Sequence, residues 1–175
     1  MIAAASASTQ IAPAIEKRAP VRDIDWVRET QSQFTPTRIS ERLWIVPSWH
    51  TPPDEHAVVV RLDPGVAFGT GTHPTTRLCL AWLDETLCAG ASVLDYGCGS
   101  GILAIGAALH GATDIDAVDI DTAAVQATAA NASANAVALR TGLPERADGD
   151  YSVVLANILA TPLKLLAPLL CDRLR

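Results

Sequence analysis

The sequence has few positive charges. Among its 175 residues, Lys and Arg number 13 against 19 Asp and Glu, which gives a formal net charge of −6 at pH 7. Proteins that clamp a nucleic-acid backbone usually present a basic surface. The charge balance therefore disfavours nucleic acid as a direct partner.

Long apolar runs and closely spaced cysteines are also missing. No apolar stretch approaches the roughly 18 to 20 residues that a membrane helix needs, so the sequence predicts no membrane span. The four cysteines, at positions 79, 88, 98 and 171, have neither the two-residue spacing of zinc sites nor the density of a disulfide scaffold. The first residues lack the basic start and apolar stretch of a secretory signal. We expect reduced thiols, no metal and a cytoplasmic location, with an organellar transit peptide as the alternative.

Three stretches of the chain differ in composition. Residues 1–22 are rich in Ala, Ser and Pro without a sustained period, which predicts a flexible tail. Residues 23–62 contain several prolines together with Trp44 and Trp49, and we predict a linker with a small β segment that the two tryptophans pack against the main domain. Residues 63–175 alternate strand-like and helix-like segments, which predicts a single α/β domain with a parallel sheet covered by helices.

The predicted elements follow from apolar runs, turns and caps. Thr72 is a possible cap for a helix that begins near Pro74, where a missing N–H costs nothing. The predicted strands are 43–46, 57–62, 93–94, 115–118, 137–139 and 151–156. Later helices are expected at 102–110, from Asp121 or Thr122 to Asn135, and at 163–174.

A glycine-rich turn holds Gly97, Gly99 and Gly101 between a strand and a helix. Such a turn alone is weak evidence, because many are only tight connections. Asp119, however, lies 22 residues after Gly97 at the end of the next predicted strand, where a carboxylate can bind the hydroxyls of a ribose. The arrangement favours a nucleoside ligand.

The choice between nucleoside cofactors depends on spacing and charge. A dinucleotide site has its third glycine where this chain has Ile102, and Asp95 would repel a pyrophosphate. The ammonium and sulfonium of S-adenosyl-L-methionine would instead be attracted to Asp95. An alternative role for Asp95 is to accept hydrogen bonds from N–H groups of the loop.

Two segments carry a resemblance to a known family. VLDYGCGSG at 93–101 resembles the first motif of S-adenosylmethionine-dependent methyltransferases with the seven-stranded fold, and LDPGVAFGTGTHPTT at 62–76 closely resembles the preceding segment of bacterial ribosomal protein methyltransferases of the PrmA type. The segments VDID, ANILA and ERLWIVPSW, at 118–121, 156–160 and 41–49, fit the same family. The resemblance runs from about Asp25 to the C-terminus.

The resemblance implies a fold, an activity and a set of site residues. The fold would be α/β, with a Rossmann-like, doubly wound, mostly parallel sheet in residues 63–175. The activity would be methyl transfer from S-adenosyl-L-methionine to lysine side chains and the α-amino group of a large-subunit ribosomal protein, the eleventh. The residues that match the family's cofactor contacts are Thr76, Gly97, Asp119 and Asn157. No catalytic group is assigned, although the Asn157 amide oxygen could orient an amine, and His73 could either cap a helix or handle a proton.

Two features depart from the family pattern. The family usually has a separate N-terminal domain, where before Trp26 we expect only the Ala- and Ser-rich tail, and the family's catalytic sheet has three further strands. We therefore expect a domain truncated after its fourth strand, with Ser152 to Ala156 at an open sheet edge. The alternatives are a non-catalytic module that binds the cofactor or self-associates, and a methyltransferase for another amine such as adenine. The latter needs an aromatic platform, which Ile158–Ala160 does not offer. The sequence predicts no oligomeric state.

Overall fold

Two β-sheets, four α-helices and one 3-10 turn make up the part of the chain described by the structure, a computed structural model. It describes residues 34–63, 71 and 73–175. The predicted tail at 1–22 and most of the 62–76 segment lie outside the described residues. Within the described ranges no helix has both the length and the apolar character needed to cross a bilayer.

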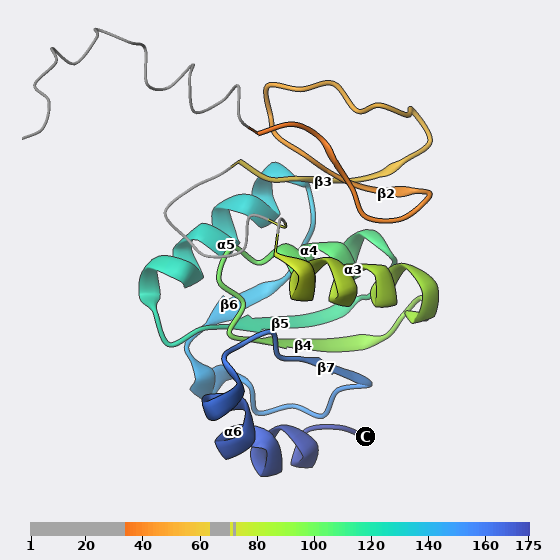
Figure 1. The fold of residues 1–175 in the computed structure, drawn as a ribbon. Helices are drawn as coiled ribbons and strands as arrows, with labels where there is room; N and C mark the ends of the chain where they lie inside the picture. Colours follow the sequence, from red (N-terminus) through yellow and green to blue (C-terminus); the bar gives the residue numbers. More distant parts are fainter. Residues whose placement is uncertain (1–33, 64–70, 72) are drawn as a thin grey trace, which may run out of the picture. The chain divides into compact units, whose positions relative to one another are not determined.

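The main sheet contains four parallel strands in the order β6-β5-β4-β7 (Figure 1). They span Ser92–Tyr96 (β4), Asp114–Val118 (β5), Arg140–Gly142 (β6) and Val153–Leu155 (β7). From β4 the chain adds β5 and β6 on one side and β7 on the other. The strand order therefore reverses at β4, and ligands of open parallel sheets bind at the carboxyl ends beside such a reversal. The predicted α/β fold with a parallel sheet is confirmed.

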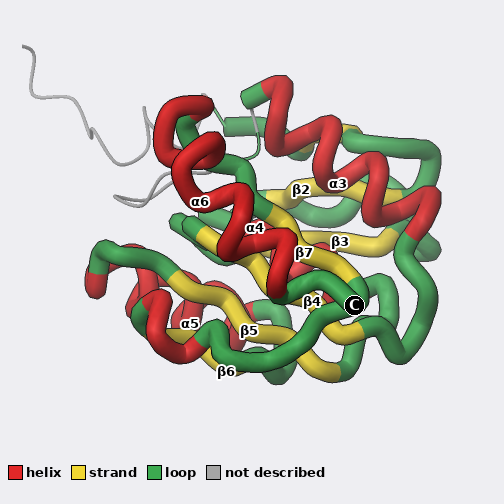
Figure 2. The backbone as a smooth tube through the Cα atoms, turned by 90° about the horizontal axis from the view of Figure 1, so that it is seen from below, coloured by secondary structure: helices red, strands yellow, loops and turns green. Residues whose placement is uncertain are grey.

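Helices cover both faces of this sheet. They span Pro74–Thr86 (α3), Ile102–Leu109 (α4), Thr122–Ala134 (α5) and Ala160–Asp172 (α6). Figure 1 shows α3, α4 and α5 on one side and α6 on the other, and Figure 2 views the sheet from the α6 side. Because successive strand residues point to opposite faces, Val93 and Ile115 join the core under α3 and α4, whereas Leu94 and Val118 join a second cluster with Leu170 of α6.

Two predicted elements need correction. The third strand is not 137–139 but β6 at 140–142, because Val137 and Leu139 pack against the core while Arg140 pairs with Asp116 of β5. The last helix begins at Ala160 rather than Leu163, since the free N–H groups of a first helical turn tolerate Pro162. Because α6 ends at Asp172, Leu174 lies beyond the helix, where it forms a parallel β-bridge with Tyr151 next to β7.

The small sheet has the order β1-β2-β3, with strands Thr37–Arg38, Leu43–Val46 and Val58–Arg61. Its contacts with the main core come from Leu43, Ile45 and Val60. Trp44 does not make this contact as predicted: it alternates with the core-facing residues of β2, and the Arg38 guanidinium lies 5.9 Å from its ring centre. The packing of Trp49 stays a prediction. A physical reason is the period of two in a strand, which directs Trp44 away from Leu43 and Ile45.

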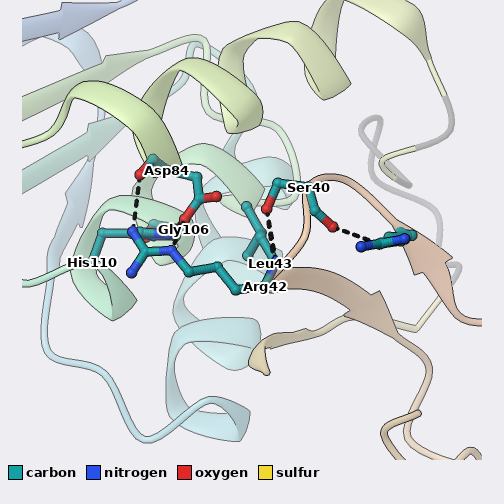
Figure 3. A network of polar contacts seen from close by, with 7 residues as sticks. Ser40, Arg42, Leu43, Asp84, Gly106 and His110 are labelled. Carbon is teal, nitrogen blue, oxygen red and sulfur yellow. Dashed lines mark hydrogen bonds and ion pairs between the residues drawn. The ribbon is translucent and has the colours of Figure 1, made fainter. Parts of the chain in front are cut away.

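Polar contacts also join the small sheet to the helices (Figure 3). The Asp84 carboxylate on α3, whose side chain is 7% exposed, accepts a hydrogen bond of 2.7 Å from Arg42 Nε and lies 2.9 Å from His110 Nε2. The His110 Nδ1 atom lies 2.7 Å from the Gly106 carbonyl oxygen. Burial raises the pKa of Asp84, but hydrogen bonds from Ser40, His110 and Arg42 outweigh it and hold this pKa below its ordinary value.

We expect Asp84→Asn to lower the free energy of unfolding by about 1 to 3 kcal/mol at pH 7, because a buried hydrogen-bonded charge is lost. A lowered carboxyl pKa stabilises the fold above the ordinary pKa and ceases to do so as pH falls through the folded value. The deficit of the variant should therefore shrink below pH 4. Urea denaturation at pH 7 and pH 3.5 measures it, with the exposed neighbour Glu85→Gln as control. An equal loss in both variants would contradict the role of Asp84.

Candidate functional site

The glycine-rich turn at 97–101 follows β4 and opens α4. Gly97, Gly99 and Gly101 have φ angles of +79°, +55° and +79°, which residues with a Cβ rarely adopt. The Gly97 and Cys98 amides donate to the Val118 carbonyl at 2.8 and 3.0 Å, so the turn is fixed to the end of β5. A Cβ atom on Gly97 would lie 2.3 Å from Ile158 Cγ2. The segment after β7 therefore approaches the turn closely.

Asp119 lies beside this turn at the end of β5. Its Oδ2 atom accepts a hydrogen bond of 2.9 Å from the Gly99 amide, and its Oδ1 atom accepts one of 3.0 Å from the Asp121 amide. The side chain belongs to a half-buried residue. Each carboxylate oxygen has a second lone pair, so Asp119 can accept hydrogen bonds from the two hydroxyls of a ribose while its backbone contacts hold it in place.

Thr76 and Asn157 meet although 81 positions separate them in the sequence. The Asn157 Nδ2 atom donates a hydrogen bond of 3.0 Å to Thr76 Oγ1. Thr76 lies in the first turn of α3 and is 3% exposed, whereas Asn157 follows β7. Because this bond uses the amide nitrogen, the amide oxygen of Asn157 is the atom that can accept an N–H from a bound amine.

Asp95, at the centre of the sheet, is 1% exposed. Its Oδ2 atom accepts a hydrogen bond of 3.1 Å from the Ala104 amide in the first turn of α4. Burial is the main reason that the pKa of Asp95 is raised to about 7; the Ala104 hydrogen bond lowers it and the charge of Asp119 raises it. Of its two predicted roles, the structure contains the contact with N–H groups, but the donor belongs to the helix rather than the loop.

His73 has a structural role. Its Nδ1 atom accepts from the Thr75 amide at 3.3 Å, which makes His73 the N-cap of α3. The predicted cap, Thr72, lies outside the described residues. The Nδ1 atom of His73 is used in this cap, and the geometry gives no support to the alternative role in proton handling.

The structure brings together all four predicted site residues. Gly97, Asp119 and Asn157 follow the ends of β4, β5 and β7, and Thr76 is hydrogen-bonded to Asn157. The described residues contain no group of three or more His, Cys, Asp or Glu side chains suited to a metal ion. Sequence reasoning missed two residues of α5, Thr128 and Asn131, which donate hydrogen bonds to carbonyl groups of the glycine turn. Their three-residue spacing on one helical face was the available signal.

The comparisons with known proteins agree with this geometry. The sequence model of the ribosomal protein L11 methyltransferase (PrmA) family matches residues 2–175. The chain belongs to this family. Ribosomal protein L11 methyltransferases of Polaromonas sp. strain JS666 and Thiobacillus denitrificans are 65% and 58% identical over 158 and 174 residues, which are 89% and 99% of this chain. These stretches are 53% and 59% of the two relatives, so the chain spans little more than half of their length.

Solved structures give the same result for the fold. The ribosomal protein L11 methylase of Lactobacillus delbrueckii subsp. bulgaricus superposes with a TM-score of 0.74 at 35% identity, covering 81% of this chain and 76% of that one. The 16S rRNA methyltransferase RsmC of T. thermophilus, solved with AdoMet and guanosine, gives a TM-score of 0.54 at 26% identity, covering 62% of this chain and 34% of that one. The PrmA-family chain therefore has the fold of S-adenosylmethionine-dependent methyltransferases.

Proposed function

We propose that the chain binds S-adenosyl-L-methionine at the carboxyl ends of β4, β5 and β7 and contributes this site to a protein N-methyltransferase. The observation that carries the proposal is the Asp119 carboxylate, which two backbone amides hold beside a turn of three left-handed glycines. An acid in this place binds ribose hydroxyls in nucleoside sites. The residues present fit the cofactor, since the Asp119 carboxylate can accept hydrogen bonds from a ribose and Asp95 adds a second acid in the strand that leads into the turn.

The substrate side of the proposal rests on the relatives. Their names give ribosomal protein L11 as the substrate, and we propose the same protein for this chain, with lysine side chains and the α-amino group as acceptors in the cytoplasm. A ribosomal RNA methyltransferase shares the fold. We favour a protein substrate because the net charge is −6 and the segment after β7, Ile158–Ala160, has no aromatic residue to stack a base.

The chemistry needs an amine that has lost its proton. When bound, the cofactor supplies an electrophilic methyl group on a sulfonium. A lysine amine with an ordinary pKa of about 10.4 must lose a proton first, at a cost of about 4 to 5 kcal/mol near pH 7. Asn157 suits the orienting role, because its neutral amide oxygen can accept an amine N–H without stabilising the ammonium form as a carboxylate would. The Thr76 hydroxyl fixes the orientation of that amide.

Calorimetry tests the cofactor proposal. We expect S-adenosylhomocysteine to bind the wild-type chain, and Asp119→Ala to weaken binding by about 1 to 3 kcal/mol because hydrogen bonds from the ribose are lost. Asp150→Ala is the matched control: it removes one exposed carboxylate before β7, at the opposite edge of the sheet. Absence of binding to folded wild-type protein would overturn the proposal. Binding without methylation of ribosomal protein L11 would instead favour a non-catalytic binding module.

A further inference from the structure

Helix α5 supports the glycine turn with two polar side chains. Thr128 is fully buried, at 0% exposed, and its Oγ1 atom donates a hydrogen bond of 3.1 Å to the Gly99 carbonyl. One turn further along the same helix, the Asn131 Nδ2 atom donates a hydrogen bond of 2.8 Å to the Ser100 carbonyl. Two consecutive carbonyl groups of the turn are therefore bonded to α5.

The direction of the hydrogen bonds at Thr128 can be deduced. The hydroxyl has one proton, and the Gly99 carbonyl can only accept, so that proton goes to Gly99. The Cys98 Sγ atom lies 3.3 Å from Thr128 Oγ1 and must then be the donor of that contact. Burial raises the pKa of Cys98 to about 12, which keeps the S–H proton in place. Thr128 is thus bonded to two consecutive residues of the turn.

The methyl group of Thr128 contributes to packing rather than to hydrogen bonding. A Cβ atom on Gly101 would lie 2.6 Å from Thr128 Cγ2, so this methyl group fills the space beside the glycine. Serine would keep the hydroxyl and leave that space empty. Valine would keep the volume and leave the Gly99 carbonyl and the Cys98 thiol without their partner. The two properties of threonine can therefore be separated by substitution.

Gly99 connects Thr128 to the predicted ribose ligand. Its carbonyl accepts from Thr128, and its amide donates to Asp119 Oδ2 at 2.9 Å. We infer that Thr128 is a positioning residue of the cofactor site: it fixes Gly99 and, through Gly99, the orientation of the Asp119 carboxylate. Asn131 supports the same turn by its hydrogen bond to the next carbonyl group, that of Ser100. This inference rests on the proposed function only in taking Asp119 as the ribose ligand.

Thr128→Val and Thr128→Ser test the inference by separating affinity from stability. We expect Thr128→Val to weaken S-adenosylhomocysteine binding about tenfold in calorimetry, as the loss of one hydrogen bond at a positioned group can. Thr128→Ser should bind within about twofold of wild type while melting at a lower temperature, because it loses a buried methyl group. Thr122→Val, at the exposed start of the same helix, is the control. If affinity simply follows melting temperature through the series, Thr128 is a packing residue and the inference is wrong.

Hydrogen exchange at the Gly99 amide gives a readout that needs no cofactor. Thr128→Val should speed this exchange at least tenfold, while Thr128→Ser leaves it near the wild-type rate. If Thr128→Val does not fold, Asn131→Ala at a half-buried position takes its place, with faster exchange expected in the same turn. Failure of the wild type to bind S-adenosylhomocysteine would overturn the proposed function alone. Equal exchange rates in all variants would overturn the role of α5.

Discussion

Replacing Arg140 by methionine should lower the free energy of unfolding by about 3 to 5 kcal/mol near neutral pH. Arg140 on β6 donates from both Nε, at 2.9 Å, and Nη2 to the carboxylate of Asp116 on β5. Asp116 is 4% exposed. Without Arg140 this buried charge retains only the Tyr151 hydroxyl at 2.9 Å and Arg146 Nε at 3.4 Å. These two contacts compensate a buried charge only in part, and a poorly compensated charge in that place is strongly destabilising.

The same substitution should reverse the pH dependence of stability. In the wild type, burial raises the pKa of Asp116, but the Arg140 hydrogen bonds, Tyr151 and Arg146 outweigh it and lower this pKa below its ordinary value. The unfolded state then binds more protons, so Asp116 stabilises the fold above its ordinary pKa and ceases to do so as pH falls. In Arg140→Met burial prevails and the pKa of Asp116 rises, so stability falls as pH increases above about 4.

Controls separate the ion pair from packing. Arg146→Met removes the longer contact and should cost about 1 kcal/mol. Asp116→Asn should cost less than Arg140→Met, because the arginine side chain that it leaves is 45% exposed and can be hydrated. Combining Asp116→Asn with Arg140→Met should restore much of the stability lost in Arg140→Met alone. Guanidinium denaturation between pH 4.5 and pH 8 measures all four proteins. Additive losses and an unchanged slope would contradict this account.

This ion pair also explains why the third strand was predicted in the wrong place. Sequence periodicity finds β4, β5, α4 and α5 within about three residues, because apolar runs, left-handed glycines and the Asp121 cap define them locally. The strand at 140–142 has no apolar run: Arg140 belongs in the sheet because Asp116, 24 positions earlier, is buried beside it. A partner at that distance leaves no trace in local hydrophobicity.

The site residues also differ in whether local sequence patterns could predict them. Gly97 and Asp119 could be predicted because a turn after one strand and an acid after the next must meet at one edge of a parallel sheet. Thr76 and Asn157 came from the family resemblance, and the bond between them depends on where α3 lies across the sheet. Thr128 escaped notice because its helix is rich in alanine, so no apolar stripe indicates which face turns inward.

Asp95→Asn should stabilise the protein at pH 8, by roughly 2 to 4 kcal/mol. Burial raises the pKa of Asp95 to about 7. The unfolded state loses this proton near the ordinary pKa, whereas the folded state keeps it until about pH 7, so the fold binds more protons in between. Wild-type stability should therefore fall from about pH 4 to pH 7 and level off above. An asparagine accepts the Ala104 hydrogen bond at every pH and removes this slope.

Thermal or urea unfolding of wild type and Asp95→Asn from pH 4 to pH 8 tests directly whether the variant is the more stable protein at high pH. The opposite change is expected for Asp84→Asn, because the pKa of Asp84 is lowered rather than raised. The two variants each remove one carboxylate, so a general effect of net charge would move both in the same direction. A parallel shift of the two curves, or Asp95→Asn less stable than wild type at pH 8, would exclude an ionised Asp95 as the source of the slope.

Asp95 destabilises the fold when it is ionised, but its charge can contribute to binding a cationic ligand. Above pH 7 an ionised Asp95 would attract the cationic methionyl part of S-adenosyl-L-methionine, so Asp95→Asn should weaken binding of this cofactor by about 1 to 2 kcal/mol while it stabilises the fold. Calorimetry at pH 8 measures the affinity. The difference between the two proteins should shrink at pH 5.5, where the Asp95 carboxyl of the wild type is protonated and therefore uncharged like the asparagine amide. Equal affinities at pH 8 would leave Asp95 with only its bond to α4.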